Sequence, residues 1–261
     1  MIVLKIGGSM AGRAEALAAD IAASGEKIVV LHGGGPQVTA LEKSLGREPV
    51  YIHSKEGFKS RHTDRETMDN FVMAVGGGVN TSLVRMLRKA GVNAVGVSGA
   101  SGIVLARRKT LVSFENGKER LIRDDCSGKI KEINASPIVA LLGAGFVPVI
   151  APIALGEEFE ALNVDGDRAA AAIAGKLGAE KLVLFTDVEG FFSNFPDDLV
   201  RSAAQADIAG FQKKASAGMK RKLVAADEAL SGGVREVIIC SGMAQKPLSG
   251  ALSGNGTHIT K

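Results

Sequence analysis

Short runs of β-branched and other apolar residues alternate with Ala-rich segments along almost the whole 261-residue chain. The apolar runs are continuous, which suits parallel strands covered on both faces, and the segments between them show the 3.6-residue apolar spacing of helices. The sequence therefore predicts an α/β protein, a three-layer α/β/α sandwich with a mainly parallel central sheet. The expected strands are 2–6, 27–31, 93–97, 147–150, 181–185 and 236–239, and the expected helices are 13–24, 36–45, 63–90, 166–177 and 216–231.

Residues 103–123 depart from this alternation. Two polar, strand-like segments flank Asn116-Gly117, a dipeptide that is favoured in tight hairpin turns. We expect a β-hairpin that lies outside the layered core. Before it, the run from Thr63 to Glu66 has the pattern of a capping box and is expected to start the long helix.

The uncharged stretch 137–156 is as long as a membrane span, but three prolines and three glycines interrupt it. It is better explained by a short helix, a turn at Gly143 to Gly145 and a buried strand. The first ten residues carry a lysine inside an apolar run and have no basic leader or cleavage signal. We therefore expect a cytoplasmic protein with no membrane partner.

Composition excludes several other classes. Glycine is frequent, with 33 residues against only 7 prolines and no G-X-Y period, which excludes collagen and indicates many tight turns. Aromatic residues are 4% of the chain, without tryptophan, so base stacking on aromatic platforms is not expected. Cys126 and Cys240 have no metal-ligand spacing, which indicates neither a zinc site nor a disulfide framework.

Two glycine-rich turns follow the first two expected strands, at residues 5–9 and 32–36. Glycine lets the backbone approach an anion closely, and the helix that follows offers free N–H groups, so the pair could hold a phosphate. Strand-to-helix turns in any α/β protein also favour glycine, which is the structural alternative. Neither turn fits GxxxxGK[ST] or GxGxxG, so P-loop and dinucleotide-binding classes are excluded.

Three charged groups also suggest chemistry. Lys5 lies near the end of a buried strand, where its ammonium must meet an anion or extend to solvent. Residues 218–222 place three cations at a helix start, which indicates a compensating anion or a solvated lysine cluster. Residues 163–167 hold more Asp and Asn side chains than one helix cap requires, which favours orientation of cations or of a metal-bound phosphate.

Arg61 precedes a helix start and could receive a carboxylate, although a surface arginine near a cap explains it equally well. The four histidines show no metal spacing and belong to no Ser/His/Asp grouping, so we expect them to be structural. They are His32, His53, His62 and His258.

Seven motifs occur in the order found in acetylglutamate kinases of the amino-acid kinase family, and the resemblance covers essentially the whole chain. They are Lys5-x-Gly7-Gly8-Ser9, His32-Gly33-Gly34-Gly35-Pro36, Arg61-x-Thr63-Asp64, Asn163-Val164-x-x-x-Asp167, Thr186-Asp187-Val188-x-Gly190, Gly218-Met219-x-x-Lys222 and Gly256-Thr257-x-Ile259.

Three segments resemble one branch of this family more closely. They are Gly57 to Asp64, Arg123 to Ile130, and Asn163 to Asp167. That branch phosphorylates aminoadipate or glutamate attached to a small LysW-type amino-group carrier protein. His62 and Cys126 stand where the branch usually has tyrosines.

The resemblance implies the amino-acid kinase or carbamate kinase-like fold. It implies an N-terminal lobe, residues 1–160, for acyl-substrate binding and dimerisation, and a C-terminal lobe, residues 161–261, for ATP. The implied reaction phosphorylates the side-chain carboxylate of carrier-linked 2-aminoadipate, glutamate or both, in lysine biosynthesis or also in arginine biosynthesis. Such a carboxylate is already deprotonated at neutral pH and needs no general base.

The resemblance also implies residue roles. Lys5 and Lys222 neutralise charge on the transferring phosphoryl group, and Asp167 orients the two ammonium groups. Substrate-binding residues are Gly34, Gly35, Arg61, which pairs with the α-carboxylate, and Asn163. ATP-binding residues are Gly7, Gly8, Ser9, Thr186, Asp187, Val188, Gly190 and Met219. Mg²⁺ is expected on the phosphates of ATP, with no side-chain metal ligand.

The expected partner is the small acidic carrier, and a homodimer is the family expectation. Basic residues concentrate on and after the expected hairpin, which favours an acidic partner over nucleic acid, because no nucleic-acid motif accompanies them. They are Arg107, Arg108, Lys109, Lys118, Arg120, Arg123, Lys129 and Lys131. The alternatives are a solvated hairpin, an N-acetylglutamate kinase of arginine biosynthesis, and a non-catalytic nucleotide-binding regulator.

Overall fold

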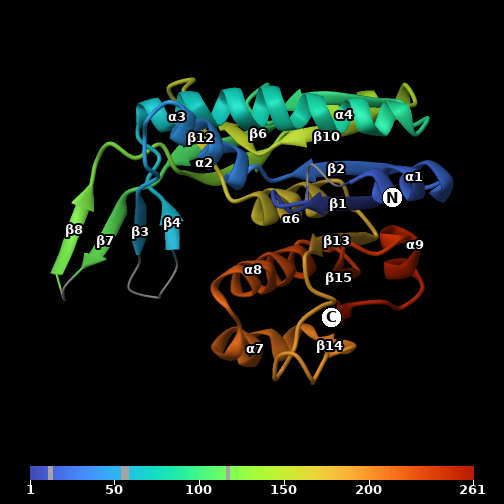
Figure 1. The fold of residues 1–261 in the computed structure, drawn as a ribbon. Helices are drawn as coiled ribbons and strands as arrows, with labels where there is room; N and C mark the ends of the chain where they lie inside the picture. Colours follow the sequence, from blue (N-terminus) through green and yellow to red (C-terminus); the bar gives the residue numbers. More distant parts are fainter. Residues whose placement is uncertain (11–13, 54–58, 116–117) are drawn as a thin grey trace.

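An eight-stranded sheet forms the centre of the molecule (Figure 1). The structure is a computed structural model, and it describes residues 1–10, 14–53, 59–115 and 118–261. Its strand order is β14-β16-β15-β13-β1-β2-β10-β5. Six strands are parallel, and the edge pair β14 and β16 is reversed because β16 runs antiparallel to β15. The bounds are β1 Ile2–Ile6, β2 Ile28–His32, β5 Ala94–Ser98, β10 Val147–Ala151, β13 Lys181–Thr186, β14 Ser202–Ala204, β15 Glu236–Ser241 and β16 Thr257–Thr260.

The six expected strands are all in this sheet, and helices cover both of its faces, so the predicted α/β/α sandwich is confirmed. One face is covered by α1, α4 and α9, and the other by α6 and α8. The bounds of the helices that cover the sheet are α1 Glu15–Ser24, α4 Asn80–Lys89, α6 Gly166–Lys176, α8 Ala217–Ser231 and α9 Pro247–Leu252. Residue 13, where we expect the first helix to start, lies outside the described residues.

The period-two alternation of β1 aims Lys5 at one face of the sheet. Ile2, Leu4 and Ile6 pack in the core beneath α1 and α4. Val3 packs in the core on the opposite face, and Lys5 points the same way, because alternate side chains of a strand share a face. Lys5 is thereby directed toward the N-terminal end of α6, where a Cβ added to Gly166 would lie 3.4 Å from Cε of Lys5.

The helix expected over 63–90 is a nearly continuous rod made of α3 (Arg65–Phe71), a π-helix (Val72–Val79) and α4. The expected capping box is wrong. Asp64 is the N-cap, and its carboxylate accepts from the backbone N–H of Thr67 at 2.7 Å. Thr63 lies before the helix and is fully buried, and its backbone N–H donates to Asp125 at 2.8 Å.

Four shorter strands build a second sheet in the order β12-β11-β6-β9. Their bounds are β6 Val104–Arg108, β9 Gly128–Ile133, β11 Ile153–Leu155 and β12 Ala161–Asn163. Sequence periodicity misses β11 and β12, because each is only three residues long, and it assigns β6 to the hairpin. This small sheet carries Asn163 to the start of α6.

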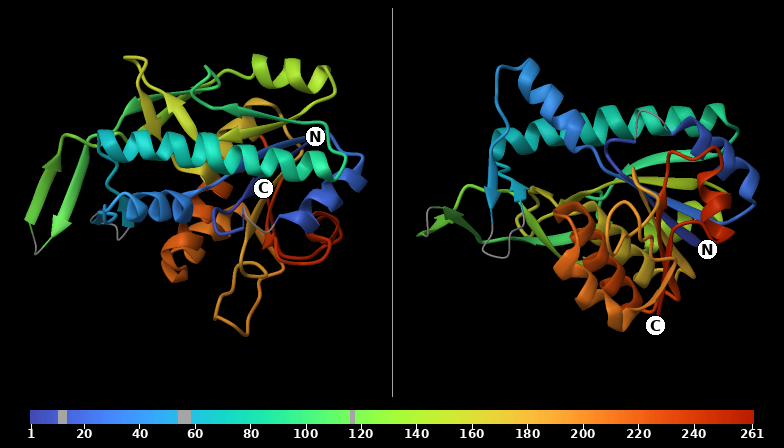
Figure 2. Two further views of the ribbon diagram at one scale, coloured as in Figure 1. Left: turned by 45° about the horizontal axis from the view of Figure 1, so that its top comes forward. Right: turned by 60° about the horizontal axis from the view of Figure 1, so that its bottom comes forward.

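The hairpin itself is the antiparallel pair β7 (Leu111–Glu115) and β8 (Lys118–Ile122), which projects from the body in all views (Figures 1 and 2). Its existence outside the core is confirmed, while the Asn116-Gly117 turn lies outside the described residues. Beside it stands a second antiparallel pair, β3 (Tyr51–His53) and β4 (Lys59–Arg61).

The remaining helices are α2 Gly35–Ser44, α5 Ser136–Gly143, a 3₁₀ turn Gln205–Asp207 and α7 Ile208–Lys214. The helix α5 and the strand β10 account for the uncharged stretch 137–156 as expected. No helix in the described part of the chain combines the length and the apolarity that a membrane crossing requires.

Candidate active site

Asp167 holds the ammonium groups of Lys5 and Lys222 together at the carboxyl end of β1. Nζ of Lys5 lies 2.7 Å from Oδ1, and Nζ of Lys222 lies 3.1 Å from Oδ2. The three side chains come from β1, the first turn of α6 and the first half of α8, and all are nearly buried. Two cations on one carboxylate leave a net positive charge in a desolvated place, which suits an anionic ligand.

Burial and the neighbouring charges shift the pKa values of Asp167 and Lys222 in opposite directions. Burial by itself raises the pKa of Asp167, but the attraction of Lys5 and Lys222 is stronger in sum and holds that pKa well below its usual range. Burial lowers the pKa of Lys222, and the neighbouring Asp167 only partly restores it. The carboxylate is therefore ionised at all physiological pH values and remains a fixed anchor for the lysines.

The two glycine-rich turns meet face to face next to this cluster. A Cβ on Gly8 would lie 2.9 Å from the backbone nitrogen of Gly34, and a Cβ on Gly33 would lie 2.8 Å from that of Gly8. Gln37 fixes the contact, because its side-chain amide donates to the carbonyl of Gly8 at 3.1 Å. The two turns therefore lie next to each other, as the sequence predicts, and Gly34 and Gly35 lie at the start of α2.

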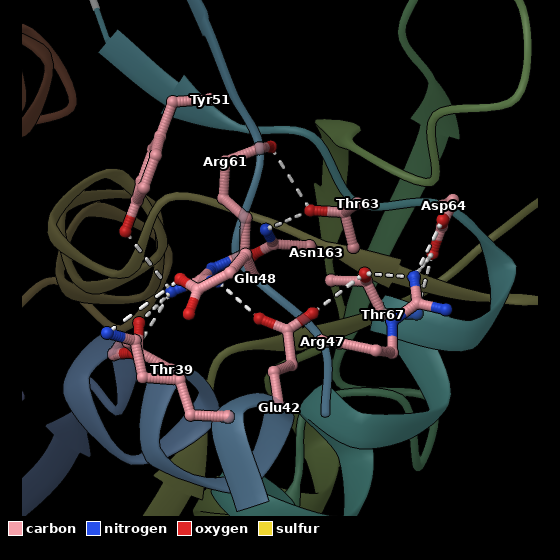
Figure 3. Close-up of polar contacts among 12 residues, drawn as sticks. Thr39, Glu42, Arg47, Glu48, Tyr51, Arg61, Thr63, Asp64, Thr67 and Asn163 are labelled. Carbon is pink, nitrogen blue, oxygen red and sulfur yellow. Dashed lines mark hydrogen bonds and ion pairs between the residues drawn. The ribbon is translucent and has the colours of Figure 1, made fainter. Parts of the chain in front are cut away.

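Arg61 is anchored by α2 (Figure 3). Its Nη1 donates to the Glu42 carboxylate at 2.5 Å, and its Nη2 donates to the hydroxyl of Thr39 at 2.5 Å and to the carbonyl of Gly35 at 3.2 Å. Glu42 is only 1% exposed. Sequence reasoning missed Glu42, because a glutamate within a short helix ordinarily faces solvent. The available signal was its position four residues after Val38, which places Glu42 on the same, buried face of the helix.

Asn163 joins the same region through Thr63. The Asn163 amide donates to the Thr63 hydroxyl at 3.1 Å, and that hydroxyl donates to the carbonyl of Arg61 at 3.3 Å (Figure 3). The buried carboxylate of Asp125 accepts from the backbone N–H groups of Thr63 and Ser127. The segment 123–130, which carries part of the branch resemblance, therefore holds the residues expected to contact the acyl substrate.

The expected nucleotide loop begins at the carboxyl end of β13. The Thr186 hydroxyl donates to the exposed Asp187 carboxylate at 3.1 Å, and the loop continues through Val188. Gly190 is buried against Thr257, whose hydroxyl accepts from the backbone of Phe191 at 2.8 Å. Ser9 is exposed and Met219 half-buried. The loops after β1 and β13 thus lie side by side, because these strands are neighbours in the sheet.

His32 is structural, as expected. It is fully buried at the end of β2, where Nδ1 donates to the Gly33 carbonyl and Nε2 accepts from the Asn80 amide at 3.0 Å. Burial lowers its pKa to about 4. The neutral imidazole therefore supports the second glycine turn from below. Among the described residues no group of three or more His, Cys, Asp or Glu side chains is arranged to hold a metal ion.

Residues 1–241 match the Amino acid kinase family, and the chain belongs to this family. It is 42% identical to the putative [LysW]-aminoadipate/[LysW]-glutamate kinase of Nitrosopumilus maritimus, over 99% of this chain and 98% of that protein. It is 40% identical to the [LysW]-aminoadipate kinase of Thermus thermophilus, over 99% of this chain and the whole of that protein.

Solved structures agree with this family. The N-acetylglutamate synthase of Neisseria gonorrhoeae superposes with a TM-score of 0.82 at 27% identity, covering all of this chain and 59% of that one. The carbamate kinase of Giardia lamblia, bound to AMP-PNP, superposes with a TM-score of 0.70 at 18% identity, covering all of this chain and 98% of that one. The second likeness establishes the fold alone, and the fold is the expected one.

Proposed function

We propose that the protein transfers the γ-phosphoryl group of ATP to the side-chain carboxylate of carrier-linked 2-aminoadipate or glutamate, in lysine biosynthesis. The single observation that carries this proposal is the pair of ammonium groups held on one buried carboxylate, Lys5 and Lys222 on Asp167. A phosphoryl group in transfer spreads negative charge over its oxygens, and the pair is placed to neutralise that charge.

In this proposal the protein positions the two substrates and neutralises phosphate charge, and it supplies no proton acceptor. The acyl carboxylate is ionised at neutral pH, so its oxygen attacks phosphorus directly while the bond to the β-phosphate oxygen breaks. Gly8 and Gly34 present backbone N–H groups to the phosphates. Arg61 pairs with the substrate α-carboxylate, and Asn163 fixes the rest of the amino acid.

Two parts of the chain divide the binding task in this proposal. Residues 1–160 supply Gly34, Gly35 and Arg61 for the acyl substrate, and residues 161–261 supply the loop after β13 for ATP. Asp167 uses both carboxylate oxygens on lysines, so it does not suit Mg²⁺. We therefore assign Mg²⁺ to the phosphates of ATP and to water, where it would neutralise phosphate charge.

The partner in this proposal is an acidic LysW-type carrier protein that bears the substrate, and the basic side chains on and after the β7–β8 hairpin favour its approach.

We further propose a homodimer in the cytoplasm. Val72 and Met73 are exposed on the π-helix, beside an apolar groove of about 440 Å³ lined by Leu41 and Val79, which a second copy would cover. The free thiols of Cys126 and Cys240 suit a reducing compartment.

The decisive test is a direct comparison of acyl acceptors. Carrier-linked aminoadipate, carrier-linked glutamate and free N-acetylglutamate are each incubated with ATP and the protein, and the acyl phosphate is trapped with hydroxylamine. We expect hydroxamate from the carrier-linked substrates. Efficient phosphorylation of free N-acetylglutamate with no reaction of either carrier-linked substrate would assign the protein to acetylglutamate kinase instead, and light-scattering of the purified protein tests the dimer.

A further inference from the structure

A hydrogen bond between α8 and β4 joins two parts of the chain that are far apart in sequence. The guanidinium of Arg221, in α8, donates through Nη2 to the backbone carbonyl of Lys59, in β4. In Figure 1, β3 and β4 stand next to α8. Lys222 directly follows Arg221, and Arg61 follows Lys59 by two residues. The bond therefore links the helix that carries Lys222 to the strand that carries Arg61.

The carbonyl of Lys59 lies on the open edge of β4. Lys59 pairs with His53 across the β3–β4 ladder, and His62, three residues later, donates its backbone N–H to the carbonyl of Val50 at 2.9 Å. Hydrogen-bonded and non-hydrogen-bonded pairs alternate in an antiparallel ladder, so the pair of Lys59 and His53 exchanges no backbone hydrogen bonds. Arg221 thus binds an acceptor that β3 leaves unused.

The side chains of Lys59 and Arg61 both lie over the ring of Tyr51 in β3. Nζ of Lys59 is 4.2 Å from the ring centroid, and Cζ of Arg61 is 5.4 Å from it. The quadrupole of an aromatic ring attracts cations at such distances. A pair of three-residue strands is only marginally stable by itself, so contacts outside the pair decide where Tyr51, Lys59 and Arg61 lie together.

Two contacts outside the pair hold this unit. Arg61 is anchored to α2 through Glu42 and Thr39. Arg221 anchors the unit to α8 at Lys59. The side chain of Arg221 is half-buried and forms no ion pair within the described part of the chain, so its bond to Lys59 is what fixes its guanidinium.

We propose that Arg221 is a positioning residue for phosphoryl transfer. By holding β4 to α8, it sets the place of Arg61 relative to Lys222. The inference rests on the proposed function, in which Arg61 binds the acyl substrate and Lys222 neutralises charge on the phosphoryl group. The attacking carboxylate and the phosphorus are then held by different parts of the chain, and small displacements between reacting atoms slow their reaction strongly.

Variants at Arg221 test this role by steady-state kinetics. Arg221→Met removes the donor, and with the acyl acceptor that the wild-type protein phosphorylates we expect kcat to fall about tenfold while KM for ATP stays within about twofold. Arg221→Lys keeps a donor and should restore kcat to within about threefold of wild type. The matched control is Arg235→Met, at an exposed position just beyond the other end of α8, and it should change kcat less than about twofold.

A double-mutant cycle tests whether Arg221 acts through Arg61. We expect Arg221→Met to lower kcat/KM for the acyl acceptor about tenfold in the wild-type background, but less than about threefold in an Arg61→Gln background. The reason is that the placement of residue 61 matters less once its guanidinium is gone. Effects that multiply in the double variant would show that the two arginines act independently.

The possible failures are distinguishable. If kcat in Arg221→Met equals that in Arg235→Met, or if the effects multiply in the cycle, the positioning role is overturned and the proposed function stands. If the wild-type protein phosphorylates free N-acetylglutamate but neither carrier-linked substrate, the proposed function is overturned, and the same variants assayed on N-acetylglutamate decide the positioning role. If the wild-type protein phosphorylates none of these acceptors, both are overturned.

Discussion

The guanidinium of Arg61 and the carboxylate of Glu42 form a buried ion pair, with Nη1 to Oε2 at 2.5 Å and side-chain exposures of 9% and 2%. Arg61 belongs to β4 and Glu42 to α2, the helix that begins at the second glycine turn. The pair therefore fixes the proposed carboxylate-binding residue relative to the backbone that is proposed to face the phosphates (Figure 3). Glu42 also accepts from the Thr67 hydroxyl at 2.9 Å, which extends the link to α3.

Replacing Glu42 should weaken binding of the carrier-linked substrate more than binding of ATP, because Glu42 holds Arg61 in place. In Glu42→Gln we expect KM for the carrier-linked substrate to rise at least tenfold while KM for ATP stays within twofold, measured by steady-state kinetics. Because removing one partner leaves a buried charge uncompensated, the free energy of unfolding should fall by about 3 kcal/mol. Glu48→Gln is the control, since Glu48 is 81% exposed and lies 3.8 Å from Lys43; equal effects in both variants would contradict a positioning role.

Asp167→Asn should strongly lower turnover through loss of charge, because two nearly buried ammonium groups would lose their shared carboxylate. We expect kcat to fall by at least about 100-fold, the scale of removing one preorganised electrostatic contact. Lys222→Met should lower kcat similarly without leaving two unpaired cations, so its thermal midpoint should stay above that of Asp167→Asn. Hydroxylamine trapping measures the first quantity and thermal unfolding the second, and unchanged turnover in Lys222→Met would contradict the assigned role.

The contact between the glycine turns predicts different thermal midpoints for Gly8→Ala and Gly35→Ala. Gly8→Ala places a methyl group 2.9 Å from the backbone of Gly34, so the turns must separate, and we expect a lower thermal midpoint and a raised KM for ATP. Gly35→Ala places its methyl group in open space and should leave the thermal midpoint unchanged. Equal thermal midpoints for the two variants would show that the turns tolerate separation.

His32 predicts a pH dependence of stability. Its pKa is about 4 in the folded protein and 6.5 in the unfolded chain, so the unfolded state binds more protons between these values and stability falls as pH drops from 6.5 toward 4. Between pH 7 and pH 5 this single group should remove about 2 kcal/mol. Urea unfolding of wild type and His32→Gln at both pH values measures it, and the difference between the two proteins should change by that amount. An unchanged difference would mean that folding does not lower the pKa of His32.

The sequence was sufficient to predict the six parallel strands of the central sheet and the main helices, but not the edge strands β14 and β16 or the second sheet. The strand around Leu4 and the strand around Val183 are continuous apolar runs, and a buried parallel strand requires little else. The strands of the second sheet are three to six residues long, and β6 pairs with β9 and β11, which are distant in sequence, so their stability comes from tertiary contacts that no local pattern records. Asp64 replaces Thr63 as the helix cap for the same reason, because Asp125, distant in sequence, binds Thr63.

The residues of the candidate site could be predicted where a motif carries them. Lys5, Asp167 and Lys222 were assigned from the resemblance, and the structure places them within hydrogen-bond distance, although their catalytic roles stay predictions. Glu42, Asn80 and Asp125 were missed. Each is a single polar side chain within an ordinary helix or loop, and it becomes significant only when folding buries it against a partner that is distant in sequence.

The central strand β1 pairs with β2 on one side and with β13 on the other. During synthesis, the strand that carries Lys5 therefore leaves the ribosome long before its neighbour β13 exists, and Asp167 and Lys222 also come late. The half-built sheet exposes an unpaired β1 edge until then, which makes that edge the place where nascent chains are most open to wrong pairing or to chaperones. In the proposed function, which needs Asp167 and Lys222 beside Lys5, phosphoryl transfer begins only after this edge has closed.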